Sequence, residues 1–189
     1  MNVRNLLSVV VMLILICVVS TVAQEQAGEN MPEIGPPAQM QHLAYLEGKW
    51  NFDMQWQDEK DTSKWNSSKG ACTYTKILDG CAMQSTFKSD MMGMPFEGFM
   101  VQNYDREKNE WQAAWIDNMS ARLSLYTGKT ENGKTSLVGE DMWQGKTMLS
   151  RMSTFNETPT SFDWTMETSF DGGKTWLLMG KAKYTKVNQ

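Results

Sequence analysis

The sequence predicts an all-β protein, built as a closed antiparallel up-and-down barrel of about ten strands, with a short N-terminal helix capping one end. Apolar and polar side chains alternate in many short segments, as they do in strands that bury one face. Turn-forming pairs such as Asp79-Gly80 and Asn132-Gly133 separate these segments at roughly 8–12-residue spacing. A long meander with one apolar face leaves no exposed edge when it closes on itself.

The first 23 residues have the pattern of a cleaved secretory signal peptide. Arg4 precedes an apolar run from residue 6 to residue 19, and small residues lead up to Ala23, where we expect cleavage. The run is about 14 residues long, which is shorter than the roughly 20 that a membrane-spanning helix needs. We therefore expect an exported protein, periplasmic or extracellular, with no membrane association after cleavage.

Residues 24–36 are polar and lack a period, which predicts a flexible leader. Residues 37–189 suit a single barrel domain with one core. Removal of Arg4 leaves 17 basic and 22 acidic residues, a net charge of −5. This charge argues against a nucleic-acid partner, because phosphate binding needs a basic face.

The two cysteines of the mature chain, Cys72 and Cys81, are predicted to be unpaired thiols. Leu78 faces Cys81 across a tight turn centred on Asp79-Gly80. Cys72 then lies six residues back along its strand, about 20 Å away at ~3.3 Å per residue. A disulfide needs Cα atoms closer than about 7 Å.

The entry helix is predicted to begin at Pro36-Pro37, since proline is tolerated in a first turn. Met40, Leu43 and Leu46 recur at helical spacing, and Gly48 stands where a helix C-cap is expected. Such a short helix is unstable alone, so its apolar side must pack against the barrel end.

After Gly48 the period changes from helical to two. Trp50, Phe52 and Met54 alternate with polar residues, and Phe162, Trp164 and Met166 repeat the pattern late in the chain. The strands that follow the first one are predicted at residues 67–78, 81–89, 96–105, 110–117, 122–129, 135–143, 147–156, 160–170 and 175–186.

Gly48-Lys49-Trp50 opens the first strand and resembles the Gly-x-Trp signature of lipocalin-type barrels, in which the tryptophan closes the barrel floor. Lipocalins stack an arginine from a late strand on that tryptophan, whereas the last arginine of this chain is Arg151.

A longer set of motifs resembles those of a bacterial family known as domain of unknown function 1579. It covers roughly residues 40 to 186 and implies a lipocalin-like (calycin-type) barrel in an exported or periplasmic setting, but no reaction. The matching motifs are His42-Leu43, Leu46-x-Gly48-x-Trp50, Leu78-x-Gly80, Gly93-x-Pro95-Phe96-x-Gly98, Tyr104-Asp105, Trp115-x-Asp117-x-Met119 and Gly128.

The predicted function is the binding of a small hydrophobic ligand inside the barrel, without a cofactor or metal. Aromatic and thioether side chains occupy inward positions, and the Met-rich segment 91–96 is expected to form a loop over the barrel mouth. The alternative is that the same rings fill the interior. The predicted ligand-binding residues are Trp50, Phe52, Met54, Met91, Met92, Met94, Phe96, Trp115, Trp164 and Met166.

Two other functions remain open. A hydrolase or isomerase could use inward carboxylates such as Asp105 or Asp117. The further charged residues within predicted strands are Arg122, Glu140, Arg151 and Glu167. A soft-metal protein could bind Cu(I) through the sulfur atoms of Met91, Met92 and Met94.

Three features favour structural roles. His42, the one histidine, is expected to hydrogen-bond to the barrel rim, because a metal site needs further ligands. Arg151 and Glu167 flank the turn at Pro159 almost symmetrically, which predicts a cross-strand ion pair. Residues 169–176 match the Asp-box hairpin of sialidase propellers, a turn device organised here by Asp171.

Overall fold

The computed structural model describes residues 33–58, 60–91, 93–143 and 145–187. The chain divides into residues 1–34 and Gly35–Gln189, and the barrel lies wholly in the second unit. The predicted signal peptide, residues 1–23, and most of the predicted leader lie outside the described residues. Within the described ranges, no helix has the length and apolar character needed to cross a membrane.

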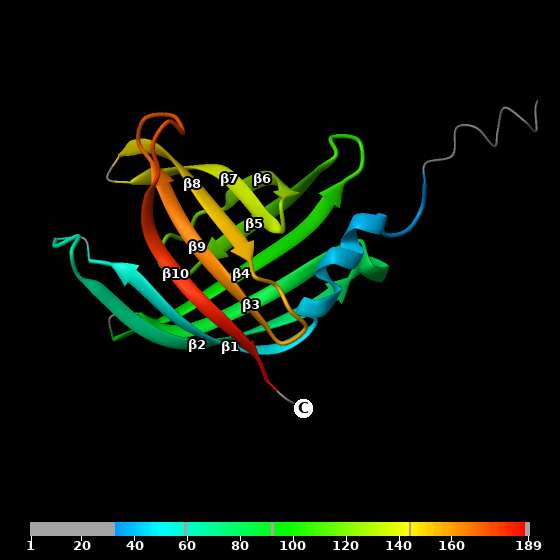
Figure 1. The fold of residues 1–189 in the computed structure, drawn as a ribbon, viewed down its shortest axis with the longest axis horizontal. Helices are drawn as coiled ribbons and strands as arrows, with labels where there is room; N and C mark the ends of the chain where they lie inside the picture. The colour runs from blue at the N-terminus through cyan, green and yellow to red at the C-terminus, as the bar shows by residue number, and fades with distance from the viewer. Residues whose placement is uncertain (1–32, 59, 92, 144, 188–189) are drawn as a thin grey trace, which may run out of the picture. The chain divides into compact units, whose positions relative to one another are not determined.

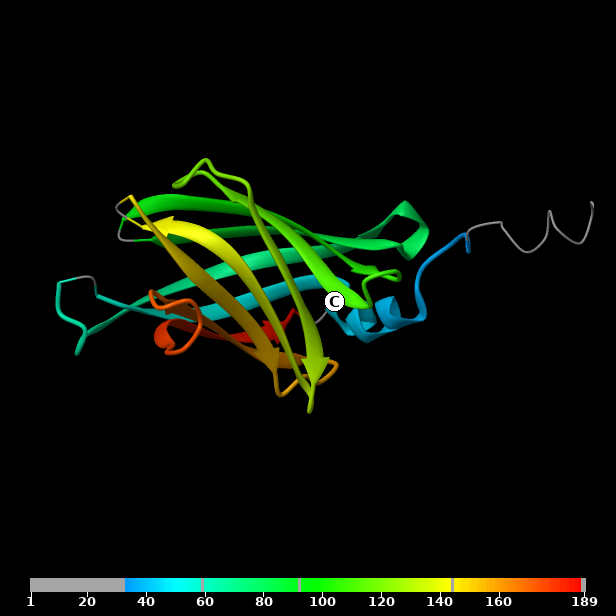
Figure 2. The same cartoon turned by 90° about the horizontal axis from the view of Figure 1, so that it is seen from above.

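The described residues of the second unit form one closed antiparallel barrel of ten strands, as predicted (Figures 1 and 2). Each strand pairs with its neighbours in sequence, and β1 pairs with β10 to close the sheet. The strands are β1 (Gly48–Gln57), β2 (Trp65–Ile77), β3 (Ala82–Met91), β4 (Met94–Asp105), β5 (Glu110–Asp117), β6 (Ser124–Glu131), β7 (Lys134–Trp143), β8 (Lys146–Phe155), β9 (Ser161–Ser169) and β10 (Leu177–Lys186).

The entry helix is the 3₁₀ helix η1 (Ala38–Leu46), and it lies at one end of the barrel (Figure 1). Pro37 precedes it, and Met40, Leu43 and Leu46 are buried as the spacing predicted. Gly48 follows the helix with a φ of +119°, a conformation that glycine adopts without steric cost. The chain can therefore turn directly from η1 into β1.

Trp50 closes the barrel beneath η1. Its indole Nε1 donates a hydrogen bond to the carbonyl oxygen of Leu46 over 2.6 Å. Its ring meets Phe162 edge-on, with the centroids 5.1 Å apart, and it is fully buried. This arrangement joins the helix to the first and ninth strands, in the position that the lipocalin resemblance implies.

The turn between β2 and β3 is longer than the sequence predicted. Ile77 and Ala82 form the last strand pair, so four residues rather than two make the turn. Leu78 and Asp79 both have φ near +54°, and the Cys81 N–H closes the turn on the Leu78 carbonyl over 3.0 Å. Leu78 is exposed, so the strand alternation ends one residue earlier than expected.

Cys72 and Cys81 are free thiols, as predicted. Cys72 is buried in β2 opposite Phe87 of β3, whereas Cys81 belongs to the turn. Burial raises the pKa of the Cys72 thiol to about 12. This thiol therefore stays protonated and unreactive at neutral pH.

Candidate functional site

A cavity of about 710 Å³ lies inside the barrel. Leu43, Tyr45 and Leu46 of η1 line one end of it. At the other end the lining continues to Lys60 and Met119, which are exposed loop residues. The cavity therefore opens at the end of the barrel opposite η1. The side chains of the barrel wall do not fill its interior.

Seven of the ten predicted ligand-binding residues line this cavity. Trp50 does not, because η1 and Phe162 enclose it in the floor. Met94 does not line it either: the side chain is 48 % exposed. Met92 lies outside the described residues. The predicted residues that line the cavity are Phe52, Met54, Met91, Phe96, Trp115, Trp164 and Met166.

The segment predicted as a loop over the mouth is a strand hairpin. Met91 of β3 pairs with Met94 of β4, so the strands continue almost to the tip. Phe96 lies in β4 and stacks on Trp115 of β5, with the ring centroids 6.2 Å apart. Met91 and Phe96 therefore contribute to the cavity wall as strand residues.

Glycines opposite the large rings help to keep the barrel hollow. A Cβ built on Gly70 would lie 2.2 Å from the Phe52 ring, and one built on Gly98 would lie 2.2 Å from the Trp115 ring. Each ring therefore occupies the space that a side chain on the neighbouring strand would need. The rings lie along the wall, and the lumen stays open between them.

One polar residue of this wall was not predicted from the sequence. Gln102 of β4 lines the cavity and is only 8 % exposed. Along β4 it continues the inward positions of Phe96, Gly98 and Met100. The period of two identifies it as inward-facing, but only apolar side chains were expected to line a hydrophobic site.

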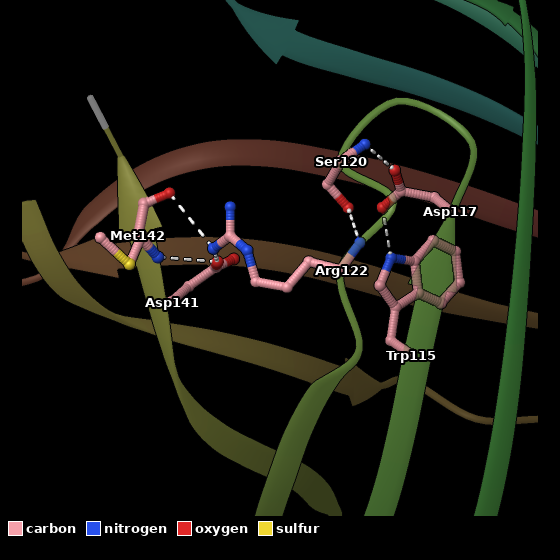
Figure 3. A network of polar contacts seen from close by, with 6 residues as sticks. All are labelled: Trp115, Asp117, Ser120, Arg122, Asp141 and Met142. Atoms are coloured by element: carbon pink, nitrogen blue, oxygen red, sulfur yellow. Dashed lines mark hydrogen bonds and ion pairs between the residues drawn. The ribbon is translucent and has the colours of Figure 1, made fainter. Parts of the chain in front are cut away.

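A polar network organises the mouth beside β5 (Figure 3). The indole Nε1 of Trp115 donates to Asp117 Oδ2 over 2.8 Å. The other oxygen, Oδ1, accepts the backbone N–H groups of Met119 and Ser120 at 2.9 and 2.6 Å. Asp117 thus fixes both a cavity-wall ring and the loop that follows β5.

Burial acts to raise the pKa of Asp117, but the hydrogen bonds from Ser120, Trp115 and Met119 outweigh it, and the pKa is lowered. The carboxylate is therefore ionised at neutral pH. In the same network Arg122 forms an ion pair with Asp141 of β7 (Figure 3). This ion pair links the loop after β5 to β7.

The candidate catalytic carboxylates do not converge. Asp105 ends β4 at the η1 end of the barrel, where it accepts the N–H groups of Glu107 and Lys108. Asp117 ends β5 at the opposite end. Asp58, the other lining carboxylate, accepts the N–H groups of Lys60 and Asp61. Each of these side chains organises a turn, and Glu140 is exposed.

Arg151 and Glu167 are register partners on β8 and β9, and their side chains pair over 2.9 Å, which confirms the predicted ion pair. The Asp-box prediction is also confirmed. Asp171 accepts hydrogen bonds from the backbone of Lys174 and Thr175, and Gly172 has a φ of +74°.

His42 lies at the barrel rim as predicted. Its Nε2 is 3.2 Å from Glu157 Oε2 and 3.3 Å from Thr135 Oγ1. The hydroxyl of Tyr45 also hydrogen-bonds to Glu157. Two residues of η1 therefore share one rim carboxylate. Among the described residues, no group of three or more His, Cys, Asp or Glu side chains could hold a metal ion.

Solved structures share this architecture. Rv2717c from M. tuberculosis superposes with a TM-score of 0.58 at 8 % identity, over 81 % of this chain and 99 % of that one. The S-type phycobiliprotein lyase CPES from Guillardia theta gives a TM-score of 0.52 at 8 % identity, over 79 % and 92 %. At this identity the likeness establishes the barrel fold alone.

A search of curated proteins finds no match. The family described as "Protein of unknown function (DUF1579)" matches residues 35–186, which includes every strand of the barrel. The chain therefore belongs to the DUF1579 family.

Proposed function

We propose that this protein binds a small hydrophobic ligand inside its barrel. The observation that carries the proposal is the cavity of about 710 Å³, which opens at one end and is walled mainly by aromatic and methionine side chains. Sites for small organic molecules are typically concave, mostly apolar and about 300–1,000 Å³ in volume. A barrel whose core had to be filled for stability alone would leave no such space.

The lining also indicates how a ligand is held. Transfer of apolar surface from water to this wall is favourable by about 25 cal/mol per Å². Methionines such as Met100 and Met152 add flexible, polarizable contacts that adapt to ligand shape. The charged lining residues among those described, Asp58, Lys60 and Asp117, belong to the mouth. Apolar ligand surface is therefore favoured within, and ionic groups are favoured at the mouth.

The proposal extends to the compartment in which the ligand is met. The predicted signal peptide supports export, so we expect the mature chain to start at Gln24 outside the cytoplasm. N-terminal sequencing of the protein recovered from periplasm or medium tests this. An N-terminus at residue 1 in a cytoplasmic fraction would contradict export and leave the binding proposal unaffected.

Binding in the cavity is tested by titration with the neutral probe N-phenyl-1-naphthylamine. The fluorescence of this probe rises in apolar surroundings. Gly180→Trp is the blocking variant, because Gly180 lines the cavity beside Trp164 and Met166. Lys181→Trp is the matched control on the exposed side of the same strand. We expect micromolar binding by the wild type and by Lys181→Trp, and at least tenfold weaker binding by Gly180→Trp.

Equal binding by all three proteins would place the probe outside the barrel. No binding by the wild type would end the proposal. Circular dichroism of each variant separates loss of the cavity from loss of the fold.

A further inference from the structure

Gln102 is a largely buried residue whose side chain has no hydrogen-bond partner within the part of the chain that the structure describes. It is 8 % exposed and lines the cavity, and its carboxamide forms no hydrogen bond with any described residue. Among the described residues, Ser68 Oγ is the one fully enclosed side-chain polar atom without a hydrogen-bond partner. The carboxamide nitrogen and oxygen of Gln102 are therefore not sealed off but face the open cavity. An unpaired donor and acceptor in this position is therefore a feature that a ligand can complete.

The neighbours of Gln102 in the sheet explain why none of the described side chains pairs with its carboxamide. The strand partners of Gln102 are Met83 on β3 and Ala113 on β5. Ala113 has no hydrogen-bonding side-chain atom, and the thioether of Met83 is only a weak acceptor. Two residues further along β4, the Tyr104 hydroxyl donates to Asn109 instead.

The position of Gln102 sets it apart from the mouth. It lies three residues before the end of β4, in the half of the barrel nearer η1. Asp58 and Asp117 belong to the opposite end, where the odd-numbered strands finish. The carboxamide is thus available to the end of a ligand that enters the barrel first.

We propose that Gln102 recognises one neutral hydrogen-bonding group on the ligand. The ligand class is then a largely apolar molecule that carries a hydroxyl, carbonyl or amide group on its buried end. This inference rests on the proposed function and adds the chemistry of the ligand to it. A carboxamide offers one acceptor and two donors, so it can pair with any of these groups.

The inner wall selects against an ionised group at the same place. Of the described lining residues, the one that carries a cation is Lys60, in the loop after β1. A carboxylate beside Gln102 would lose its hydration without gaining a counter-ion, which is strongly unfavourable. A neutral group loses less hydration free energy, and a hydrogen bond to the carboxamide replaces the bond that it made to water.

A matched pair of ligands tests the proposal. 2-Naphthol and 2-methylnaphthalene have the same ring system and differ by a hydroxyl in place of a methyl group. The affinity of each ligand is measured by displacement of N-phenyl-1-naphthylamine from the wild-type protein and from Gln102→Met. This substitution keeps the unbranched shape of the side chain and removes the carboxamide's donor and acceptor groups. Met100→Leu, two residues away on the same wall, is the control for altered packing.

We expect Gln102→Met to weaken 2-naphthol roughly five- to tenfold, the equivalent of one hydrogen bond, and to change 2-methylnaphthalene less than twofold. Met100→Leu should leave the ratio of the two affinities unchanged. Wild-type protein should bind 2-naphthoate at least tenfold more weakly than 2-naphthol.

An unchanged ratio in Gln102→Met would overturn the role of Gln102, and equal binding of 2-naphthoate would overturn the neutral ligand class. Both outcomes leave probe binding intact. Failure of the proposed function is a different result, namely that the wild type binds no probe.

Discussion

The ammonium group of Lys186 lies over the ring of Trp50, with Nζ 5.3 Å from the ring centroid. The same nitrogen donates a hydrogen bond to the carbonyl oxygen of Tyr45 over 2.7 Å. A lysine from the last strand therefore occupies the place that the lipocalin resemblance assigns to an arginine. It joins β10, β1 and η1 at the closed end of the barrel.

Replacement of this lysine should destabilise the protein. We expect Lys186→Met to lower the free energy of unfolding by about 1–3 kcal/mol, because it removes a partly buried cation–π contact and a charged hydrogen bond. Lys183→Met on the same strand, which breaks the ion pair with Asp163, should cost less than about 1 kcal/mol. Urea unfolding measures both, and equal losses would show that the contact with Trp50 contributes nothing specific.

The glycine that accommodates Trp115 gives a second prediction. Gly98→Ala should lower the free energy of unfolding by about 1–3 kcal/mol, because the new Cβ would overlap a ring held by Asp117. Gly180 is the comparison, because a Cβ there would meet its neighbours at 3.5 Å or more. Gly180→Ala should be neutral within about 1 kcal/mol. If thermal and urea unfolding show equal losses of stability for Gly98→Ala and Gly180→Ala, the packing of the Trp115 ring does not depend on Gly98.

Asp171 gives a pH dependence of known sign. Hydrogen bonds from the Thr175 hydroxyl and backbone, and from Ser169, lower the pKa of Asp171 to about 2 from 3.8. A carboxyl group whose pKa is lowered by folding stabilises the native state above its unfolded pKa, and this contribution disappears as pH falls through the folded value.

The melting temperature of Asp171→Asn should therefore lie below that of the wild type at pH 5–7. The gap should narrow between about pH 4 and pH 2. Asp79→Asn is the control, since Asp79 lies in another turn and accepts no side-chain hydrogen bond within the described residues. A gap that is independent of pH would mean that the charge of Asp171 does not stabilise the hairpin.

The barrel and its strands could be predicted because a period of two fixes which side chains face inward. The same period says nothing of height along the barrel. Trp50 and Phe52 both face inward, yet Trp50 lies in the floor and Phe52 in the cavity wall. That difference depends on where η1 packs, a contact set by tertiary structure.

The sequence also does not predict whether the lumen is open or filled. It depends on rings that lie against glycines of neighbouring strands, as Trp115 does against Gly98, and hence on strand register. The methionines of segment 91–96 suggested a loop over the mouth, whereas Met91 and Met94 form the last pair of the β3–β4 hairpin. The strand pattern identifies Gln102 as inward-facing. That its side chain has no partner among the residues described depends on its neighbours Met83 and Ala113, which the strand register sets.

The most direct test of a ligand cavity is a methyl NMR titration of ¹³C-methyl-methionine protein with 2-methylnaphthalene. The aromatic ligand shifts the resonances of methyl groups that it touches. We predict shifts at the cavity-lining residues Met54, Met100, Met152 and Met166, with little change at Met40, which is buried in η1 and does not line the cavity. Shifts confined to the exposed Met94 and Met142, or no shifts at all, would contradict it.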